Sequence, residues 1–199
     1  MEQTKQYEYV DLGLPSGTKW AKCNVGAETE TDYGDYFMWG STTPNTPDEC
    51  IMAKAPFNGG ASSYNEEYIN SVKDTVCPNG ILAKEYDAAT QIMGSDWRMP
   101  TRDDFQELIN NTTKEWTTIN EVNGYKFTGS NGNSIFIPAA GDCYDGSMGG
   151  VDNGGFVWSS SINTFHPRYA WFLGFLSGYC EMGNCGHCCI GRSVRGVMN

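Results

Sequence analysis

The sequence has few basic residues and no long apolar run. It carries 13 lysines and arginines against 24 aspartates and glutamates, which gives a formal net charge of −11, and the basic residues are scattered. We therefore expect no binding to nucleic acid, which needs a basic surface. No apolar stretch is long enough to cross a bilayer, so we also expect no membrane insertion. The first residues, M-E-Q-T-K-Q-Y, lack the layout of a secretory signal peptide.

Glycine and aromatic residues are abundant instead. The 199 residues include 24 glycines, 6 tryptophans and 11 tyrosines. This composition is typical of a domain with many loops that aromatic side chains hold against the core. We predict one α+β domain over residues 1–199, with a small twisted antiparallel sheet, two helices and long ordered loops.

The N-terminal third predicts short strands and then a long loop. Residues 7–27 place alternating apolar side chains on both sides of a Pro-Ser-Gly turn, which is typical of two short strands. Residues 28–65 are polar and contain the segment D-Y-G-D-Y-F-M-W-G. We expect its aromatic side chains to pin an irregular loop to the core.

Two helices are predicted in the middle of the chain. The first covers residues 82–92. The second begins after Thr101, which suits the N-cap position, and has Asp103 and Asp104 in its first turn. Its apolar face carries Phe105, Leu108 and Ile109.

The C-terminal half predicts short strands and turns. The expected strands cover residues 116–120, 124–129, 134–138, 156–161, 171–176 and 191–197, and the last one should lie close to the N-terminal strands. A glycine-rich loop joins two of them over residues 141–155. Its acidic residues in Gly141–Gly146, together with Asp152, lack the regular spacing of a calcium loop. We interpret them as a solvated turn.

The predicted strand 171–176 has two different faces. Trp171, Leu173 and Phe175 form one face, which we expect to pack on the core. The other face carries Phe172, Gly174 and Leu176, and this combination does not indicate a packing face. The alternative is a second face buried under a loop, because a continuously apolar strand is often buried on both sides.

Four of the eight cysteines lie in the segment Y-C-E-M-G-N-C-G-H-C-C-I-G-R, residues 179–192. A zinc site would use Cys185 and Cys188, with Cys180, His187 or Cys189 completing the ligands. The candidates, however, crowd into one short segment without the usual second pair. A local disulfide or reduced thiols are the alternatives. A cysteine nucleophile activated by His166 or His187 is a further possibility, but nothing in the sequence orients either histidine, and we predict no catalysis.

Several blocks of the sequence, in order, carry a resemblance to a known family. They are Y-V-D-L-G-L-P-S-G-T-K-W-A-K-C-N-V-G-A, D-Y-G-D-Y-F-M-W-G, W-R-M-P-T-R-D-D-F-Q-E-L-I, N-G-Y-K-F-T-G-S-N-G-N-S-I-F-I-P-A-A-G, V-W-S-S-S and G-R-S-V-R-G-V. Together they resemble bacterial and phage domains with a C-type lectin fold. More narrowly, the chain resembles the variable proteins of diversity-generating retroelements, which include phage major tropism determinants.

The resemblance implies a hypervariable surface. In that family, copying errors at template adenines turn asparagine codons into codons for many other residues, cysteine included, but not for Lys, Glu, Gln, Trp or Met. The cysteine-rich segment then represents randomised asparagines, and the variable region would cover residues 164–190. The implied ligand-binding residues are Phe165, His166, Arg168, Tyr169, Phe172, Gly174, Leu176, Tyr179, Cys180, Cys185, His187, Cys188, Cys189 and Ile190.

The resemblance also implies a function without catalysis. We expect binding of a cell-surface or protein ligand, on a phage virion or a bacterial cell surface, with no cofactor, metal or calcium and with homo-oligomers possible. The alternatives are a zinc-stabilised interaction module and an oxidoreductase like the formylglycine-generating enzymes, which the W-R-M-P-T block also resembles. A recognisable version of that enzyme group's C-terminal catalytic block is missing from the sequence.

Overall fold

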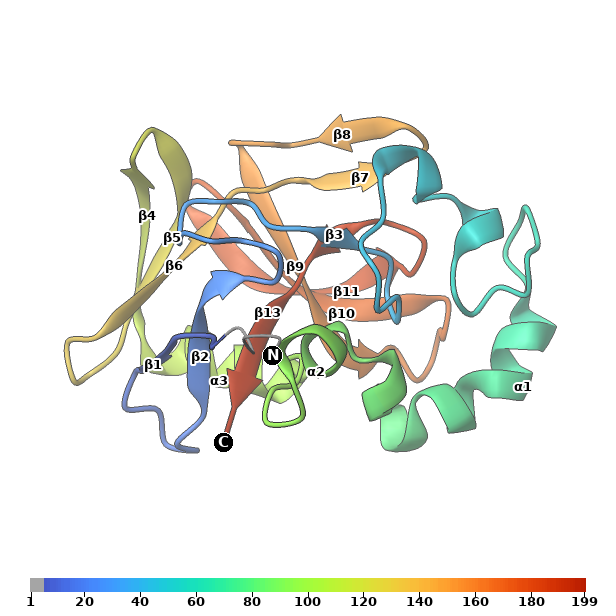
Figure 1. Cartoon of the computed structure of the whole chain (residues 1–199), viewed down its shortest axis with the longest axis horizontal. Helices are drawn as coiled ribbons and strands as arrows, with labels where there is room; N and C mark the ends of the chain where they lie inside the picture. The colour runs from blue at the N-terminus through green and yellow to red at the C-terminus, as the bar shows by residue number, and fades with distance from the viewer. Residues whose placement is uncertain (1–5) are drawn as a thin grey trace, which may run out of the picture.

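A computed structural model describes residues 6–199, apart from the side chain of Asn184, and shows a mixed α/β protein with several small, mostly antiparallel sheets and few helices. The molecule is elongated, with a three-stranded sheet at one end and helix α1 (Glu66–Val76) at the other (Figure 1). The predicted α+β class is thus confirmed at this level. Residues 1–5 of the predicted domain lie outside the described part.

One sheet joins the two ends of the chain. Strands β1 (Tyr9–Asp11), β2 (Lys19–Asn24) and β13 (Arg195–Met198) pair antiparallel in the order β1-β2-β13. The predicted proximity of the terminal strands is therefore confirmed.

Arg195 fastens this sheet to its neighbours from within the core. The side chain is 0% exposed, and its guanidinium donates hydrogen bonds to the Asn24 side chain and to the backbone carbonyls of Ala21 and Phe136, at 2.8 to 2.9 Å. Burial lowers the pKa of Arg195 to about 10, so the side chain is still charged at neutral pH. Since most of these acceptors are backbone atoms, the arginine links the strands whatever their side chains are.

A second sheet is a simple meander. Strands β4 (Thr113–Ile119), β5 (Val122–Thr128) and β6 (Ser134–Pro138) pair antiparallel in sequence order. The β4–β5 turn uses Asn120 and Glu121 at φ of +48° and +68°. Positive φ at both turn residues matches the twist of a two-residue hairpin. The predicted strands at 116–120, 124–129 and 134–138 correspond to this sheet.

The largest sheet has five strands in the order β11-β10-β9-β12-β3, with bounds Tyr179–His187, Tyr169–Leu176, Gly154–Ile162, Arg192–Ser193 and Tyr36–Phe37. All pairs are antiparallel except β12 with β9. The predicted glycine-rich loop contains a further hairpin, β7 (Asp142–Tyr144) and β8 (Ser147–Gly149), which was not predicted.

Helix α3 (Arg102–Asn111) confirms the second predicted helix. The Thr101 hydroxyl accepts from the backbone N–H of Asp104, and the Asp104 carboxylate accepts from the backbone N–H of Thr101. This reciprocal pair satisfies the first donors of the helix. Phe105, Leu108 and Ile109 are buried, as predicted.

The first predicted helix is wrong in extent, and a further helix was missed. Within residues 82–92, a 3-10 turn (Lys84–Tyr86) precedes helix α2 (Ala88–Met93), because the Asp87 carboxylate caps α2 at the backbone N–H of Thr90. Helix α1 was not predicted. The other 3-10 turns are Pro47–Glu49, Met52–Lys54 and Pro78–Gly80.

The predicted packing face of residues 171–176 needs one correction. Leu173 and Phe175 are fully buried, but Trp171 is only half-buried. The register of β10 shifts between Ala170 and Phe172, against both neighbouring strands, so Trp171 lies at a bulge. The guanidinium of Arg102 stacks over its indole ring at 4.1 Å from the ring centroid.

The core of residues 6–199 divides into three clusters. The first core cluster surrounds Trp39, Trp97 and Trp158, and the second surrounds Trp20, Phe105 and Phe175. The third core cluster is Met38, Cys50, Ala55, Cys143 and Cys189. Trp39 donates its indole N–H to the carbonyl of Ser159 at 2.8 Å, so the long loop over residues 28–65 is pinned to the core by aromatic side chains, as predicted.

Candidate ligand-binding surface

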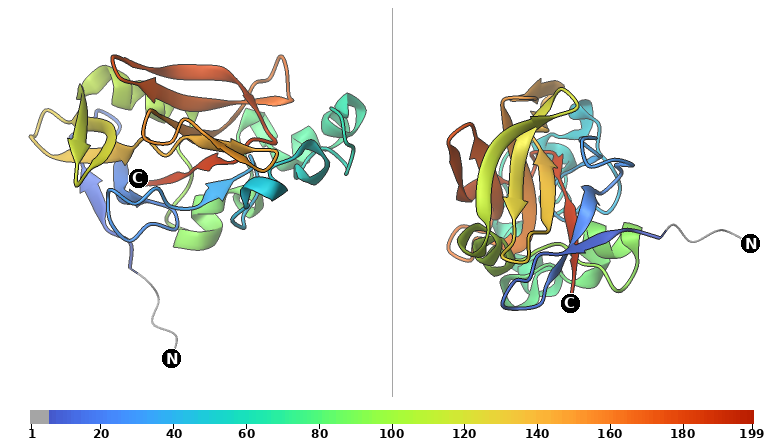
Figure 2. Two further views of the ribbon diagram at one scale, coloured as in Figure 1. Left: turned by 90° about the horizontal axis from the view of Figure 1, so that it is seen from above. Right: turned by 90° about the vertical axis from the view of Figure 1, so that its left-hand side faces the viewer.

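Residues 164–190 form a turn and a hairpin at one edge of the largest sheet. The turn at 163–168 leads into β10, and a tight turn at Ser177 and Gly178 connects β10 to the edge strand β11. Seen from above, this hairpin runs along one long side of the molecule (Figure 2). Only β10 borders β11 within the sheet, so the outer edge of the hairpin carries no further strand of the described chain.

The middle of the hairpin is built around Phe172. Its ring lies over two glycines, because a Cβ atom on Gly183 would overlap the ring and one on Gly174 would approach it to 3.0 Å. Phe172 also contacts Trp158 edge to face, with ring centroids 6.1 Å apart. Phe172 is therefore half-buried, and the face it belongs to is neither fully exposed nor fully covered by a loop.

Arg192 lies beneath Phe172 and was not predicted as part of the site. Its guanidinium is 3.9 Å from the Phe172 ring centroid and 4.5 Å from that of Trp158. Its Nη2 is 3.3 Å from the Asp142 carboxylate, and its Nη1 is buried without a hydrogen-bond partner among the described residues. Burial lowers the pKa of Arg192 to about 10, while the Asp142 charge opposes that shift.

A second group lies where β10 begins and β11 ends. Tyr169 pairs with His187 in the register, and their rings are 4.7 Å apart at 68°. The Arg168 guanidinium stacks on Tyr169 at 4.7 Å and on Tyr64 at 5.3 Å. Burial and the charges of two arginines lower the pKa of His187, so its imidazole is neutral at pH 7.

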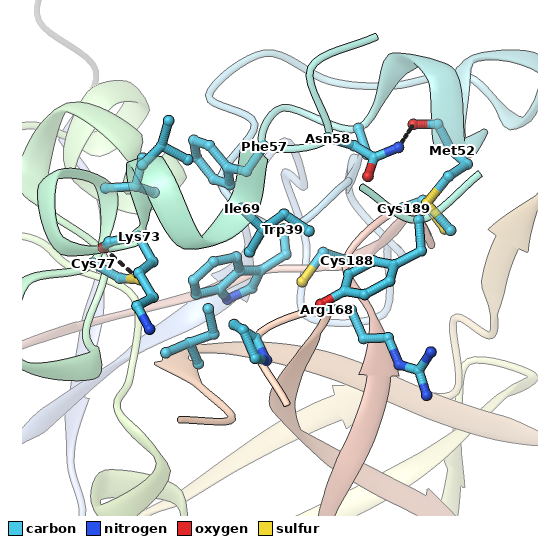
Figure 3. Close-up of a pocket in the computed structure, with 16 residues that line it drawn as sticks. Trp39, Met52, Phe57, Asn58, Ile69, Lys73, Cys77, Arg168, Cys188 and Cys189 are labelled. Atoms are coloured by element: carbon cyan, nitrogen blue, oxygen red, sulfur yellow. Dashed lines mark hydrogen bonds between the residues drawn. The ribbon is translucent and has the colours of Figure 1, made fainter. Parts of the chain in front are cut away.

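Arg168 also lies at a small apolar cavity beside helix α1. The cavity of about 20 Å³ is lined mainly by apolar side chains, and Figure 3 shows the Arg168 guanidinium at its margin. The other lining residues include Trp39, Phe57, Ile69, Val76, Cys77, Cys188 and Cys189. Such a volume holds about one water molecule. A ligand larger than a water molecule would therefore have to bind the surface above the cavity.

The most exposed apolar side chains of the region lie at its two ends. Phe165, in the turn before β10, is 90% exposed. Leu176 and Tyr179 face each other across the hairpin turn and are about half exposed. Each end of the region therefore offers exposed apolar side chains of the kind found in binding surfaces.

The four cysteines of the C-terminal segment do not converge. Cys180 packs on the second core cluster, Cys188 on the first, and Cys189 belongs to the third. Cys185 is exposed on β11. Within the described residues no three His, Cys, Asp or Glu side chains are grouped as metal ligands, and the cysteines considered for the alternative zinc site lie apart.

The remaining predicted site residues have mixed surroundings. His166 lies beside Tyr169 with ring centroids 6.5 Å apart, and Ile190 is partly buried against the first core cluster. Burial raises the pKa of Cys180 to about 11 and raises those of Cys188 and Cys189 as well. These thiols are protonated at neutral pH, which is the opposite of what a cysteine nucleophile requires.

In the acidic loop that was considered for calcium, two carboxylates interact with other groups of the protein. The Asp142 carboxylate faces Arg192, and Asp152 accepts a hydrogen bond from the backbone N–H of Asn123 at 3.0 Å. One feature of the sequence could have indicated that Arg192 has a special role. It is a charged residue inside the predicted strand G-R-S-V-R-G-V. The sequence offered no such feature for Tyr64, which lies about a hundred residues away from Arg168.

Comparisons with protein families, with curated proteins and with solved structures gave no match to this chain. Within residues 6–199, every helix is too short or too polar to cross a membrane.

Proposed function

We propose that the chain is a non-enzymatic binding protein whose β10–β11 hairpin and preceding turn form a variable ligand-binding surface on a C-type lectin-like frame. The proposal extends the resemblance to the retroelement variable proteins, and residues 164–190 are the variable region. The ligand is a protein or another molecule on a cell surface, and the chain is displayed on a phage virion or a bacterial surface.

The alternation along β10 carries the proposal. Leu173 and Phe175 are fully buried in the second core cluster, whereas Leu176 is half exposed and Phe172 is half-buried on the opposite face. Exposed side chains of this face, such as Leu176, can change without creating a cavity in the core, where losing a large residue costs roughly 2–5 kcal/mol. A hairpin with this division suits a surface that changes while the fold persists.

The position of the hairpin gives further support. It lies at the edge of the largest sheet. Strand β9, which pairs with β10, and strand β12, which pairs with β9, belong to the blocks V-W-S-S-S and G-R-S-V-R-G-V that frame the predicted variable region. The paired terminal strands and the long pinned loop agree with the lectin-like frame that the resemblance implies.

Sequencing of the DNA around the gene, followed by deep sequencing of its 3′ end in a population, tests the proposal. We expect a neighbouring near-copy with AAC or AAT at codons 180, 185, 188 and 189, a reverse-transcriptase gene, and substitutions concentrated at the exposed positions Phe165, Leu176 and Tyr179. Codons 173 and 175, which lie between variable codons but outside the predicted set of variable positions, are the internal control and should remain unchanged. An invariant segment without a template copy would contradict the proposal.

A further inference from the structure

Cys50 and Cys143 lie in contact although 93 positions separate them in the sequence. Their sulfur atoms are 3.2 Å apart in the third core cluster, and the two side chains are 0% and 1% exposed. Cys50 follows the 3-10 turn Pro47–Glu49, and Cys143 is the central residue of β7. Both lie outside residues 164–190, so an inference about them does not depend on the proposed function.

The surrounding backbone holds the two sulfurs against each other. Cys143 and Gly191 exchange two backbone hydrogen bonds, each of 2.8 Å, and the carbonyl of Cys50 accepts from the N–H of Asp145 at 3.0 Å. A Cβ atom on Gly191 would overlap both sulfurs, so the pair packs directly on the backbone of this glycine. Both cysteines are thus fixed by main-chain contacts from two sides.

We propose that Cys50 and Cys143 form a structural disulfide when the chain folds in the presence of a thiol oxidant. The bond would fasten the loop of residues 47–54 to the β7–β8 hairpin and close a long stretch of chain. A cross-link between residues this far apart in sequence restricts the unfolded chain strongly.

The oxidant is a disulfide, either a small one such as oxidised glutathione or that of a thiol oxidoreductase. In one order, the Cys143 thiolate attacks one oxidant sulfur, forms a mixed disulfide and releases one oxidant thiolate. The Cys50 thiolate then attacks the Cys143 sulfur and releases the second oxidant thiolate. The two protons lost by the cysteines pass through solvent to the two released thiolates, so two electrons move from the protein to the oxidant.

Either thiol can attack the oxidant first, because the hydrogen bond that lowers the pKa of Cys143 and raises that of Cys50 exists only in the folded chain. Because both sulfurs are buried in the folded chain, the exchange takes place before the loop of residues 47–54 docks. For the same reason the finished bond is shielded from reductants.

Cys189 is the competing partner, because it belongs to the same cluster. The sulfur–sulfur contact of 3.2 Å, however, joins Cys50 to Cys143, and Gly191 packs against both of these sulfurs. This geometry favours the Cys50–Cys143 pair.

Peptide mapping of the full chain decides between these pairings. The protein is refolded with a glutathione redox mixture, denatured with N-ethylmaleimide, and digested with trypsin and a glutamate-specific protease. Cys50 then lies in the fragment 50–54, Cys143 in 127–168 and Cys189 in 182–192. We expect fragments 50–54 and 127–168 to be joined, and to separate on reduction. Alkylation of both Cys50 and Cys143, or a link from 50–54 to 182–192, would overturn the proposal.

A thermal melt gives a second measurement. Protein refolded in excess reductant should melt roughly 5–15 °C below the oxidised protein. The variant Cys50→Ala/Cys143→Ala should show no difference between the two conditions, and Cys189→Ser is the matched control that should keep the full difference. Equal melting of the oxidised and reduced wild-type chains would contradict a structural bond. If the double variant does not fold, the wild-type peptide map still decides.

Discussion

Two arginines three positions apart, Arg192 and Arg195, are both buried but are held in opposite ways. Arg195 ties the terminal sheet to its neighbours and donates mainly to backbone carbonyls. Arg192 lies under the β10–β11 hairpin and is held mainly by aromatic side chains, with one Nη atom left without a partner among the described residues. Backbone carbonyl acceptors are present whatever the neighbouring residues are. Aromatic partners are present only while the residue is aromatic, and one of them, Phe172, lies in the predicted variable region.

The contrast indicates how a stable frame can carry a changeable surface. Contacts to the main chain make the frame around Arg195 independent of substitutions in residues 164–190. The layer around Arg192 depends on the residue at position 172, so under the proposed function it would have to accept a range of neighbours. Its ion pair with Asp142, whose side chain is 25% exposed, is available whichever residue lies above.

Loss of the Arg195 hydrogen bonds is the largest effect we expect. In Arg195→Met the buried carbonyls of Ala21 and Phe136 and the side chain of Asn24 lose their donor. Since an unsatisfied buried polar group costs about 1–3 kcal/mol, the free energy of unfolding should fall by about 3–5 kcal/mol. Urea denaturation followed by circular dichroism measures it. Arg195→Lys should recover part of the loss, and a change below about 1 kcal/mol would show that the frame does not depend on these bonds.

A smaller loss is expected at Arg192. Arg192→Met keeps the long side chain under Phe172, removes a buried charge with an unpaired nitrogen, and leaves Asp142 partly hydrated. We expect a loss of about 1–2 kcal/mol, clearly less than for Arg195→Met. Combining Arg192→Met with Phe172→Ala in a double-mutant cycle should give a coupling of about 0.5–2 kcal/mol from the cation–π contact. Additive effects in the cycle would mean that the cation–π contact contributes nothing to stability. An equal loss of unfolding free energy in Arg192→Met and Arg195→Met would contradict the contrast between the two arginines.

The sequence was most informative where local chemistry determines the structure. Helix α3 follows from Thr101 at its N-cap and Asp104 three positions later, and strand β6 from a continuous apolar run between turns. Helix α1 was missed because only Ile69 and Val76 of its residues are buried, which leaves little apolar periodicity to detect.

The parts of the site that were missed depend on contacts distant in sequence. A period of two predicts the faces of β10 correctly for Leu173 and Phe175, but it cannot reveal the bulge that moves Trp171 out of the core. The stacking of Arg168 on Tyr64 and the contact of Cys50 with Cys143 join residues that local patterns cannot relate. The cysteines of the C-terminal segment pack on three different core clusters, which their spacing in the sequence does not reveal.

The smallest effect on stability is expected at the exposed ends of the hairpin. Comparing substitutions there with substitutions in the core distinguishes the binding surface from the frame most directly. A library that randomises Phe165, Leu176 and Tyr179 should consist mostly of folded members, because substitutions at exposed positions usually change stability by less than about 0.5 kcal/mol. The matched library at Trp158, Leu173 and Phe175, which are fully buried, should be mostly unfolded, since each truncation there removes roughly 2–5 kcal/mol.

Resistance to protease during surface display, sorted and sequenced, measures the folded fraction of both libraries without any knowledge of the ligand. If the two folded fractions are equal, the alternation along β10 does not protect the fold, and the hairpin is not suited to variation. If the surface library folds and the core library does not, residues 164–190 can be exchanged at their exposed positions while the two arginines and the sheets they hold remain in place. That separation is the physical requirement for a variable binding surface, and it holds for whatever ligand the surface takes.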